Sequence, residues 1–292
     1  MRARLIILRI IAYCSLAMGM SWQTLLCAAP ITVVLPAKIV ANADFREGDT
    51  HKPAVLVLHG FMATYNLNIV QSIAGELEGL GYTVLAPTLS LRINNRHTGA
   101  NCEAIHTHTM ETDVKEINWW INWLKHKGHR DIRIIGFSTG ALQAADLLEK
   151  RVPKAVKKAI LVSPIYMTGS PFPQAVEQAD LLKASSLAKQ GNTKLHSYSL
   201  SYCKNNFMAP AKVYLSYKAW TKQRLFEAIE SIAIPVTVIV GGNDMRFGSQ
   251  WVSELKSTGK RVIVIAGANH FFDALQEFDF LEKLGTELLN TK

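Results

Sequence analysis

One stretch constrains this chain more than any other, residues 132–148, which read IRIIGFSTGALQAADLL. Residues 132–135 are rich in isoleucine, which is typical of a strand buried on both faces. The pentapeptide GFSTG follows at once at residues 136–140, and apolar side chains then recur at helical spacing up to Leu148. The pattern predicts a strand that enters a helix through a G-x-S-x-G turn.

This turn suits a nucleophilic serine for steric and electrostatic reasons. Ser138 must take a strained backbone conformation on a tight turn, so neighbouring chain comes very close to it. Gly136 and Gly140 have no Cβ that could clash there. The following helix directs its first N–H groups and the positive end of its dipole at the serine, where negative charge would develop. Glycine-rich pentapeptides also arise by chance in loops, but the flanking strand and helix favour the functional interpretation.

The first 28 residues have the layout of a secretory signal peptide. Three arginines (Arg2, Arg4, Arg9) form a basic start, residues 5–26 are largely apolar, and Leu-Cys-Ala-Ala at 26–29 ends the stretch with small residues. We expect cleavage after Ala28, a folded domain over residues 29–292, and export to a bacterial periplasm or beyond. A retained membrane anchor is the main alternative. Lipid attachment at Cys27 is disfavoured, because a lipoprotein signal needs a small residue where Leu26 stands.

The composition suits one large α/β domain, with 49% hydrophobic residues among 292. Removing the leader's three arginines from the 32 basic residues leaves 29 against 23 acidic ones, a net charge of +6. No basic run interleaved with aromatic residues is present, so the sequence does not favour a nucleic-acid partner. We also expect no stable membrane insertion once the leader is removed.

Two cysteines, Cys102 and Cys203, lie outside the predicted leader. An even pair in an exported chain suggests one disulfide, although two free thiols are the alternative. No C-x-x-C occurs, which excludes a zinc ribbon and a thioredoxin-like motif.

Strand-like and helix-like segments alternate along the chain. This alternation predicts an α/β fold with a mainly parallel central sheet and helices on both faces. The predicted strands are residues 31–42 (one or two strands), 54–58, 82–86, 132–135, 158–163, 236–241 and 261–266, and the longer helices are 66–80, 111–127 and 271–289.

Two segments interrupt the alternation. Residues 88–110 have little periodicity and are predicted to form a long loop. Residues 165–232 are rich in Gly, Pro, Ser and Tyr, and we interpret them as a small inserted cap without a buried strand.

Three polar residues follow predicted strand ends in the order Ser138, Asp244, His270. Ligands of open parallel sheets bind beyond the carboxyl ends of the strands. With the segments HGF (59–61), GFSTG, GGNDMRF (241–247) and GANHFF (267–272), the chain resembles the α/β-hydrolase superfamily over residues 31–289. Within it, the chain is most similar to secreted bacterial serine hydrolases of the esterase and lipase kind.

The resemblance implies a role for each of these residues. Ser138 would be the nucleophile, His270 the general base, and Asp244 the acid that orients His270. Backbone N–H groups of Phe61 and Thr139 would form the oxyanion hole. Asp244 could instead be an ordinary turn residue, with an acid such as Asp131 as the partner of the histidine.

The implied substrate is a small-molecule ester, hydrolysed without a cofactor through an acyl-enzyme. Thioesters, lactones, amides and a peroxide-using reaction stay open, whereas a serine at position 138 argues against dehalogenases and epoxide hydrolases of this superfamily. A non-catalytic protein that binds a ligand or partner under the cap is the alternative from another class.

Three further features have a structural and a functional interpretation. His106 and His108 could ligate a metal, but we expect a solvated or hydrogen-bonded loop, and we predict no metal site. The tryptophans at positions 119, 120 and 123 are predicted to pack in the core rather than bind carbohydrate. In this fold the loop of Cys102 and the cap of Cys203 emerge at the same end of the sheet, so a disulfide between them would hold the cap at the rim of the site.

Overall fold

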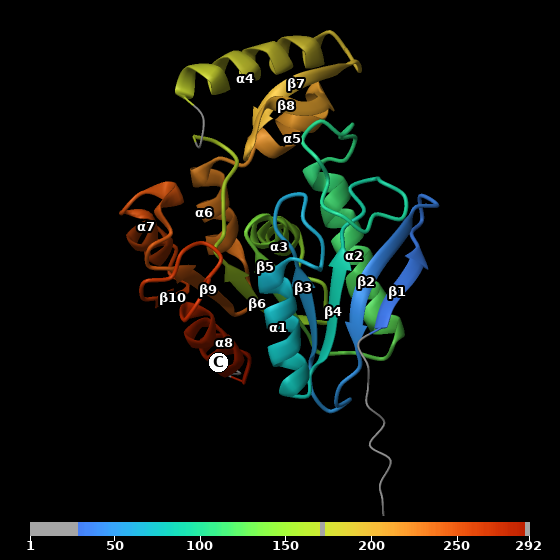
Figure 1. Cartoon of the computed structure of the whole chain (residues 1–292), viewed down its shortest axis with the longest axis vertical. Coiled ribbons are helices and arrows are strands. Elements are labelled where there is room, and N and C mark those ends of the chain that lie inside the picture. Colours follow the sequence, from blue (N-terminus) through green and yellow to red (C-terminus); the bar gives the residue numbers. More distant parts are fainter. Residues whose placement is uncertain (1–28, 170–172, 290–292) are drawn as a thin grey trace, which may run out of the picture.

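An eight-stranded sheet forms the centre of the protein, for which a computed structural model describes residues 29–169 and 173–289 (Figure 1). Its strand order is β1-β2-β4-β3-β5-β6-β9-β10; β2 runs antiparallel to its neighbours β1 and β4, and the pairs from β4 to β10 are parallel. The predicted fold class is thereby confirmed. The strands are β1 (Ala29–Val34), β2 (Val40–Arg46), β3 (Ala54–Leu58), β4 (Thr83–Thr88), β5 (Ile132–Phe137), β6 (Val156–Val162), β9 (Val236–Gly241) and β10 (Arg261–Ile265).

Helices cover both faces of the sheet, because the central strands are apolar on both sides. In β3, for example, Leu56 and Leu58 face one core while Val55 and Val57 face the other. The first core lies under α2 (Met110–His126), α3 (Thr139–Lys150), α6 (Lys222–Ser231) and α7 (Trp251–Ser257), and the second lies under α1 (Asn68–Gly79) and α8 (Gln276–Leu289).

The tryptophan cluster belongs to the first of these cores, as predicted. Trp120 is fully buried. Trp119 and Trp123 pack against the same core, and each of their rings meets the Trp120 ring edge-on.

Several element boundaries differ from the sequence prediction, and two of the differences have a clear physical reason. β4 extends to Thr88, beyond the predicted end at residue 86, and therefore contains Pro87. Pro87 is paired with Ala43 of β2 but lies beyond the pairing with β3, so its missing N–H breaks no bond on that side. The last helix begins at Gln276 rather than at residue 271, because Phe272 and Ala274 have positive φ angles of 57° and 63°, which a right-handed helix cannot contain.

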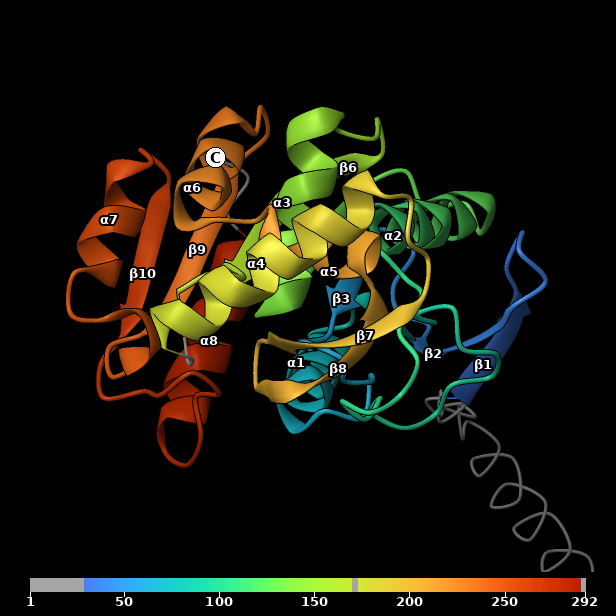
Figure 2. The ribbon, with the colours of Figure 1, turned by 90° about the horizontal axis from the view of Figure 1, so that it is seen from above.

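Residues 165–169 and 173–232, the described parts of the segment interpreted as a cap and called the cap segment below, stand above the carboxyl edge of the sheet, except that α6 returns to pack on α3 (Figures 1 and 2). The segment contains α4 (Gln174–Lys189), the antiparallel hairpin of β7 (Leu195–Leu200) and β8 (Cys203–Pro210), and α5 (Ala211–Lys218).

The expectation that this segment has no buried strand is wrong. Tyr198, Leu200, Cys203 and Phe207 of the hairpin are fully buried. The hairpin strands mix polar and apolar residues, because only part of each strand faces the core; such half-buried antiparallel strands lack the continuous apolar run of a central strand.

A disulfide joins Cys102 to Cys203, as the sequence suggested. Backbone hydrogen bonds reinforce this junction, since Met208 N–H donates to Cys102 O (3.3 Å) and His106 N–H donates to Met208 O (2.9 Å). The long loop before α2 is therefore tied to strand β8 of the cap segment.

The predicted leader, residues 1–28, lies outside the described residues. Across 29–169 and 173–289, none of the helices combines the length and the apolar character that a bilayer-spanning segment needs.

Candidate active site

Ser138 stands at the junction of β5 and α3 with φ 56° and ψ −115°. A non-glycine residue in this region is strained and persists only where the surroundings hold it. Here the Ser138 N–H donates to Val162 O of the adjacent strand (2.9 Å), and its carbonyl accepts from Ala141 N–H (3.0 Å) in the first turn of α3. Strand β5 and helix α3 therefore both fix the backbone of the serine.

Both glycines of the turn are required by close backbone contacts. A Cβ on Gly136 would lie 2.4 Å from the carbonyl oxygen of Gly140, and a Cβ on Gly140 would lie 2.6 Å from that of His59. Both contacts are far inside van der Waals distance, and neither partner is a flexible side chain. The spacing of the G-x-S-x-G motif is thus a steric consequence of how β3, β5 and α3 meet.

The structure brings together the three residues that the sequence singled out. His270 Nε2 lies 3.1 Å from Ser138 Oγ, and His270 Nδ1 lies 2.6 Å from Asp244 Oδ2. Exposed fractions of the three residues are 6% for Ser138, 4% for His270 and 7% for Asp244. A fourth residue helps to place the ring, since the Ser163 hydroxyl donates to the backbone carbonyl of His270 (3.1 Å).

The pKa of His270 is lowered from its ordinary value near 6.5. Burial is the main cause, because it disfavours the charged imidazolium; the positive charge of Arg246 acts in the same direction, while Asp244 opposes both. The imidazole is consequently neutral at neutral pH, with one ring nitrogen able to accept a proton from Ser138.

Asp131, the other acid considered from the sequence, lies at the opposite end of strand β5 from Ser138. Its carbonyl accepts from Ala54 N–H (3.0 Å), at the amino ends of β3 and β5, whereas Ser138 follows the carboxyl end of β5. Asp131 therefore lies at the opposite edge of the sheet from His270.

His59 shapes the loop that carries Phe61. Its Nδ1 is 2.8 Å from Gly60 O, and its Nε2 accepts from Leu89 N–H (3.0 Å). A trans peptide directs its C=O and N–H in opposite directions, so a Gly60 carbonyl held by the His59 ring turns the Phe61 N–H away from that ring. Burial, aided by nearby Arg96, lowers the pKa of His59 to about 3, so this histidine is a neutral scaffold.

Within residues 29–169 and 173–289, the two predicted oxyanion donors have no competing acceptor. Among the described residues, neither the N–H of Phe61 nor that of Thr139, the first residue of α3, donates to another group of the protein. First-turn N–H groups of a helix lack intrahelical partners, which leaves them for a ligand.

His106 and His108 are buried and hydrogen-bonded, so of the two expected alternatives the hydrogen-bonded one is confirmed and the solvated one is not. His106 Nε2 contacts the carbonyls of Asn101 and Cys102 (3.1 and 3.2 Å), and His108 Nδ1 contacts both carboxylate oxygens of Asp113 (3.2 Å each). Within residues 29–169 and 173–289, no group of three or more His, Cys, Asp or Glu side chains is arranged to hold a metal ion.

Asp113 is the centre of a buried network that the sequence did not reveal. Besides His108, it accepts hydrogen bonds from the Tyr217 hydroxyl and from Gln143 Nε2 (3.1 Å). Tyr217 belongs to α5 and Gln143 to α3, so this network joins the cap segment to the helix that begins at Ser138.

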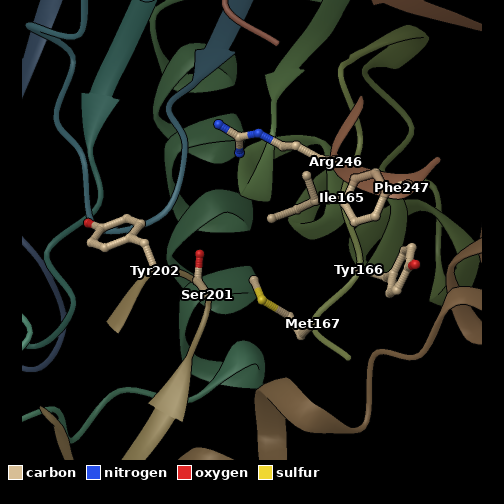
Figure 3. A pocket seen from close by; sticks show the side chains of 7 residues that line it. All are labelled: Ile165, Tyr166, Met167, Ser201, Tyr202, Arg246 and Phe247. Carbon is tan, nitrogen blue, oxygen red and sulfur yellow. The ribbon is translucent and has the colours of Figure 1, made fainter. Parts of the chain in front are cut away.

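Figure 3 shows a cavity of about 200 Å³ whose lining includes Arg246, and Arg246 Nε lies 4.0 Å from Asp244 Oδ1. Sequence reasoning missed most of its lining, although Arg246 and Phe247 belong to the GGNDMRF segment and could have been noted there. The lining residues are Ile165, Tyr166, Met167, Ser201, Tyr202, Arg246 and Phe247.

Comparison with known proteins agrees with this architecture. Residues 53–192 match the protein family described as "alpha/beta hydrolase fold". No curated protein sequence matches the chain. Three solved structures illustrate the structural likeness.

Est1E from Butyrivibrio proteoclasticus is 14% identical and has a TM-score of 0.62; the alignment covers 90% of this chain and 99% of that one. The alpha/beta hydrolase GrgF from Penicillium sp. sh18 has 14% identity and a TM-score of 0.67, with 91% and 98% covered. The esterase EaEST from Exiguobacterium antarcticum has 15% identity and a TM-score of 0.62, with 89% and 99% covered. At such low identity the likeness concerns the fold alone.

The sheet order, the strained serine turn and the family match together identify the chain as an α/β-hydrolase-fold protein. Its structural neighbours include two proteins described as esterases.

Proposed function

We propose that this protein is a serine hydrolase that cleaves carboxylic esters through Ser138, His270 and Asp244. The observation that carries the proposal is the continuous hydrogen-bonded chain from Ser138 Oγ through His270 to Asp244, at 3.1 and 2.6 Å, with the serine on a strained turn. This is the geometry that nucleophilic catalysis by serine requires.

In this mechanism Ser138 Oγ attacks the ester carbonyl while His270 Nε2 takes the hydroxyl proton. Asp244 keeps the other ring nitrogen protonated and stabilises the imidazolium. The N–H groups of Phe61 and Thr139 bind the oxyanion, an interaction worth about 3 kcal/mol for each donor in known cases. His270 then protonates the leaving alcohol, and water, activated by the same histidine, releases the acid from the acyl-enzyme.

An ester is favoured over the other carbonyl substrates by the structural neighbours. These include two esterases and a monoacylglycerol lipase from Paleococcus ferrophilus, and one neighbour, Est1E, is known with ferulic acid bound. A thioesterase domain is also among them, so a thioester is the second substrate class to examine. The reaction as proposed uses no cofactor or metal.

A fluorophosphonate probe tests the proposal, since it labels only an activated serine. We expect the purified protein to be labelled and to hydrolyse short activated esters, and Ser138→Ala to lose both properties, with activity falling by roughly 10³-fold or more. Ser231→Ala, at the exposed end of α6, is the matched control and should retain both. An unlabelled wild-type protein without esterase activity would instead favour a non-catalytic protein that binds a ligand or partner under the cap.

The proposal includes export, with residues 1–28 as a signal peptide and 29–292 as the mature protein. Support comes from the basic and apolar leader and from the Cys102–Cys203 disulfide, which persists in oxidising compartments such as a bacterial periplasm. The intact mass of protein recovered from the medium or periplasm should correspond to a chain that begins at Ala29. A mass that includes Met1, found in a membrane fraction, would indicate a retained anchor.

A further inference from the structure

The cavity beside the triad residues has an unusual combination of lining groups. Its walls are mainly aromatic and aliphatic, and Ser201 contributes a hydroxyl. Among its lining residues Arg246 alone is charged, and Figure 3 shows its guanidinium reaching from the side of Phe247 toward the side of Tyr202. A ligand held here would therefore contact a hydrocarbon surface and one positive charge.

The cavity lies between the two halves of the proposed catalytic machinery. On one side, Arg246 follows Asp244 by two residues in the turn after β9. On the other side, Tyr202 contacts Phe61, with their ring centroids 5.5 Å apart. A substrate whose ester carbonyl is bound between Ser138 and the Phe61 N–H can consequently extend its remaining part into this cavity.

The guanidinium of Arg246 is held in place but retains unused donors. Its Nε lies 4.0 Å from Asp244 Oδ1, and the group stacks over the Phe271 ring at 5.3 Å from the centroid. Its two terminal nitrogens donate to no acceptor within the described part of the chain, and the Arg246 side chain is 46% exposed. Asp244 does not occupy the two terminal nitrogens, because its Oδ1 lies 4.0 Å from Arg246 Nε, beyond hydrogen-bond distance, and its Oδ2 is bonded to His270 Nδ1 at 2.6 Å.

We propose that Arg246 binds a carboxylate of the substrate, so that the preferred substrates are esters that carry a second, free carboxylate separated from the ester by a short hydrocarbon segment. This inference rests on the proposed esterase function. A paired set of N–H donors matches the two oxygens of a carboxylate. One positive charge balances one carboxylate, whereas a phosphate monoester carries about −1.5 to −2 at neutral pH. The aromatic and aliphatic walls suit the hydrocarbon segment between the two ends.

Matched substrates test the proposal. Monoethyl succinate, glutarate and adipate carry the carboxylate on the acyl side, and ethyl esters of monocarboxylic acids of the same chain length are their neutral counterparts. For the alcohol side, 4-acetoxybenzoate is compared with 4-acetoxybenzamide. The readout is the ratio of kcat/KM for charged and neutral partners, because a ratio cancels any general effect on catalysis. We expect at least one pair to favour the charged ester by about tenfold or more.

Three variants assign this preference to the guanidinium. Arg246→Gln removes the positive charge, so the ratio of kcat/KM for charged and neutral esters should fall by about tenfold or more. Arg246→Lys, which keeps the charge but not the paired donors, should fall in between. Arg151→Gln, at an exposed residue after α3, removes the same charge elsewhere and should leave the ratio unchanged. Equal ratios in the wild type and Arg246→Gln would overturn the proposal.

A binding measurement separates this proposal from the esterase function itself. Adipate and glutarate are titrated calorimetrically into the Ser138→Ala protein and into the same protein with Arg246→Gln. Dicarboxylate binding that weakens about tenfold or more without Arg246 supports the carboxylate site even if no ester is cleaved. If the protein hydrolyses neutral esters but the dicarboxylates do not bind, or bind equally well without Arg246, the carboxylate site would be overturned. The esterase function would then still stand.

Discussion

The ring of Tyr202 meets the ring of Phe61 edge-on, with centroids 5.5 Å apart and an angle of 82° between the planes. Tyr202 directly precedes Cys203, whose disulfide ties the hairpin β7–β8 to the loop of Cys102. Phe207 of the same hairpin also lies near Phe61, at 6.3 Å between centroids. The disulfide therefore holds in place the aromatic groups that pack on a proposed oxyanion residue.

Removing the disulfide should lower both stability and activity. The Cys102→Ala, Cys203→Ala double variant loses a closure that spans 101 residues, for which the chain-entropy relation gives about 4–5 kcal/mol at most. We expect a lower denaturant midpoint and a lower kcat, since the hairpin would no longer press on Phe61. Unchanged unfolding in the double variant would contradict this expectation. Alkylation of the exported protein, denatured without reduction, should label no cysteine.

Asp244→Asn should reduce kcat by about 10⁴-fold with little change in KM, as loss of the orienting acid does in other serine triads. The matched control is Asp131→Asn, at the opposite edge of the sheet, which should be nearly silent. Steady-state kinetics on a short activated ester, with circular dichroism to check the fold, decide between them. If Asp131→Asn were the damaging change, the assignment of the acid would be wrong.

The acid limb of the pH–activity profile should report on His270. Only the neutral imidazole can accept the proton of Ser138, so activity should rise with pH, and because the pKa is lowered the midpoint should lie below 6.5. Arg246 contributes to this lowering by disfavouring the nearby imidazolium. Arg246→Gln should therefore move the midpoint of kcat/KM for a neutral ester to higher pH. A midpoint that stays in place would show that burial alone sets the titration.

Stability should fall on acidification because of His59. Its pKa is about 3 in the folded protein and near 6.5 in an unfolded chain, so between these values the unfolded chain binds the additional proton. The free energy of unfolding then decreases as pH drops from about 6.5 toward 3, by at most about 1.4 kcal/mol per pH unit for this residue. His59→Gln, compared with a variant at exposed His97, should flatten the pH dependence of urea unfolding. Equal slopes in both variants would argue against it.

Much of the fold could be predicted from local patterns, and the errors have identifiable causes. Central strands such as β3 and β5 are continuous apolar runs because both of their faces are buried. The hairpin β7–β8 escaped notice because its strands are half-buried and carry polar residues. The start of α8 was misplaced because the apolar Phe271 and Phe272 extend the helical pattern into a turn with a left-handed residue.

The amino-acid sequence by itself indicated those features that depend on residues close together in the chain. The GFSTG turn is defined by close contacts that exclude a Cβ at Gly136 and Gly140, and the ends of parallel strands necessarily lie on one edge of a sheet. These local and topological constraints indicated that Ser138, Asp244 and His270 lie at one edge of the sheet, and the resemblance to the α/β-hydrolase superfamily supplied the roles proposed for them.

Tertiary structure alone decided which distant side chains meet. Asp113 and Tyr217 are separated by 104 residues, yet they share a buried hydrogen bond that no periodicity in the sequence indicates. The same holds for the orientation of the Arg246 guanidinium into the cavity and for the contact of Tyr202 with Phe61. Such contacts depend on how the cap segment packs on the sheet, and packing is set by the shapes of many side chains at once rather than by any local pattern.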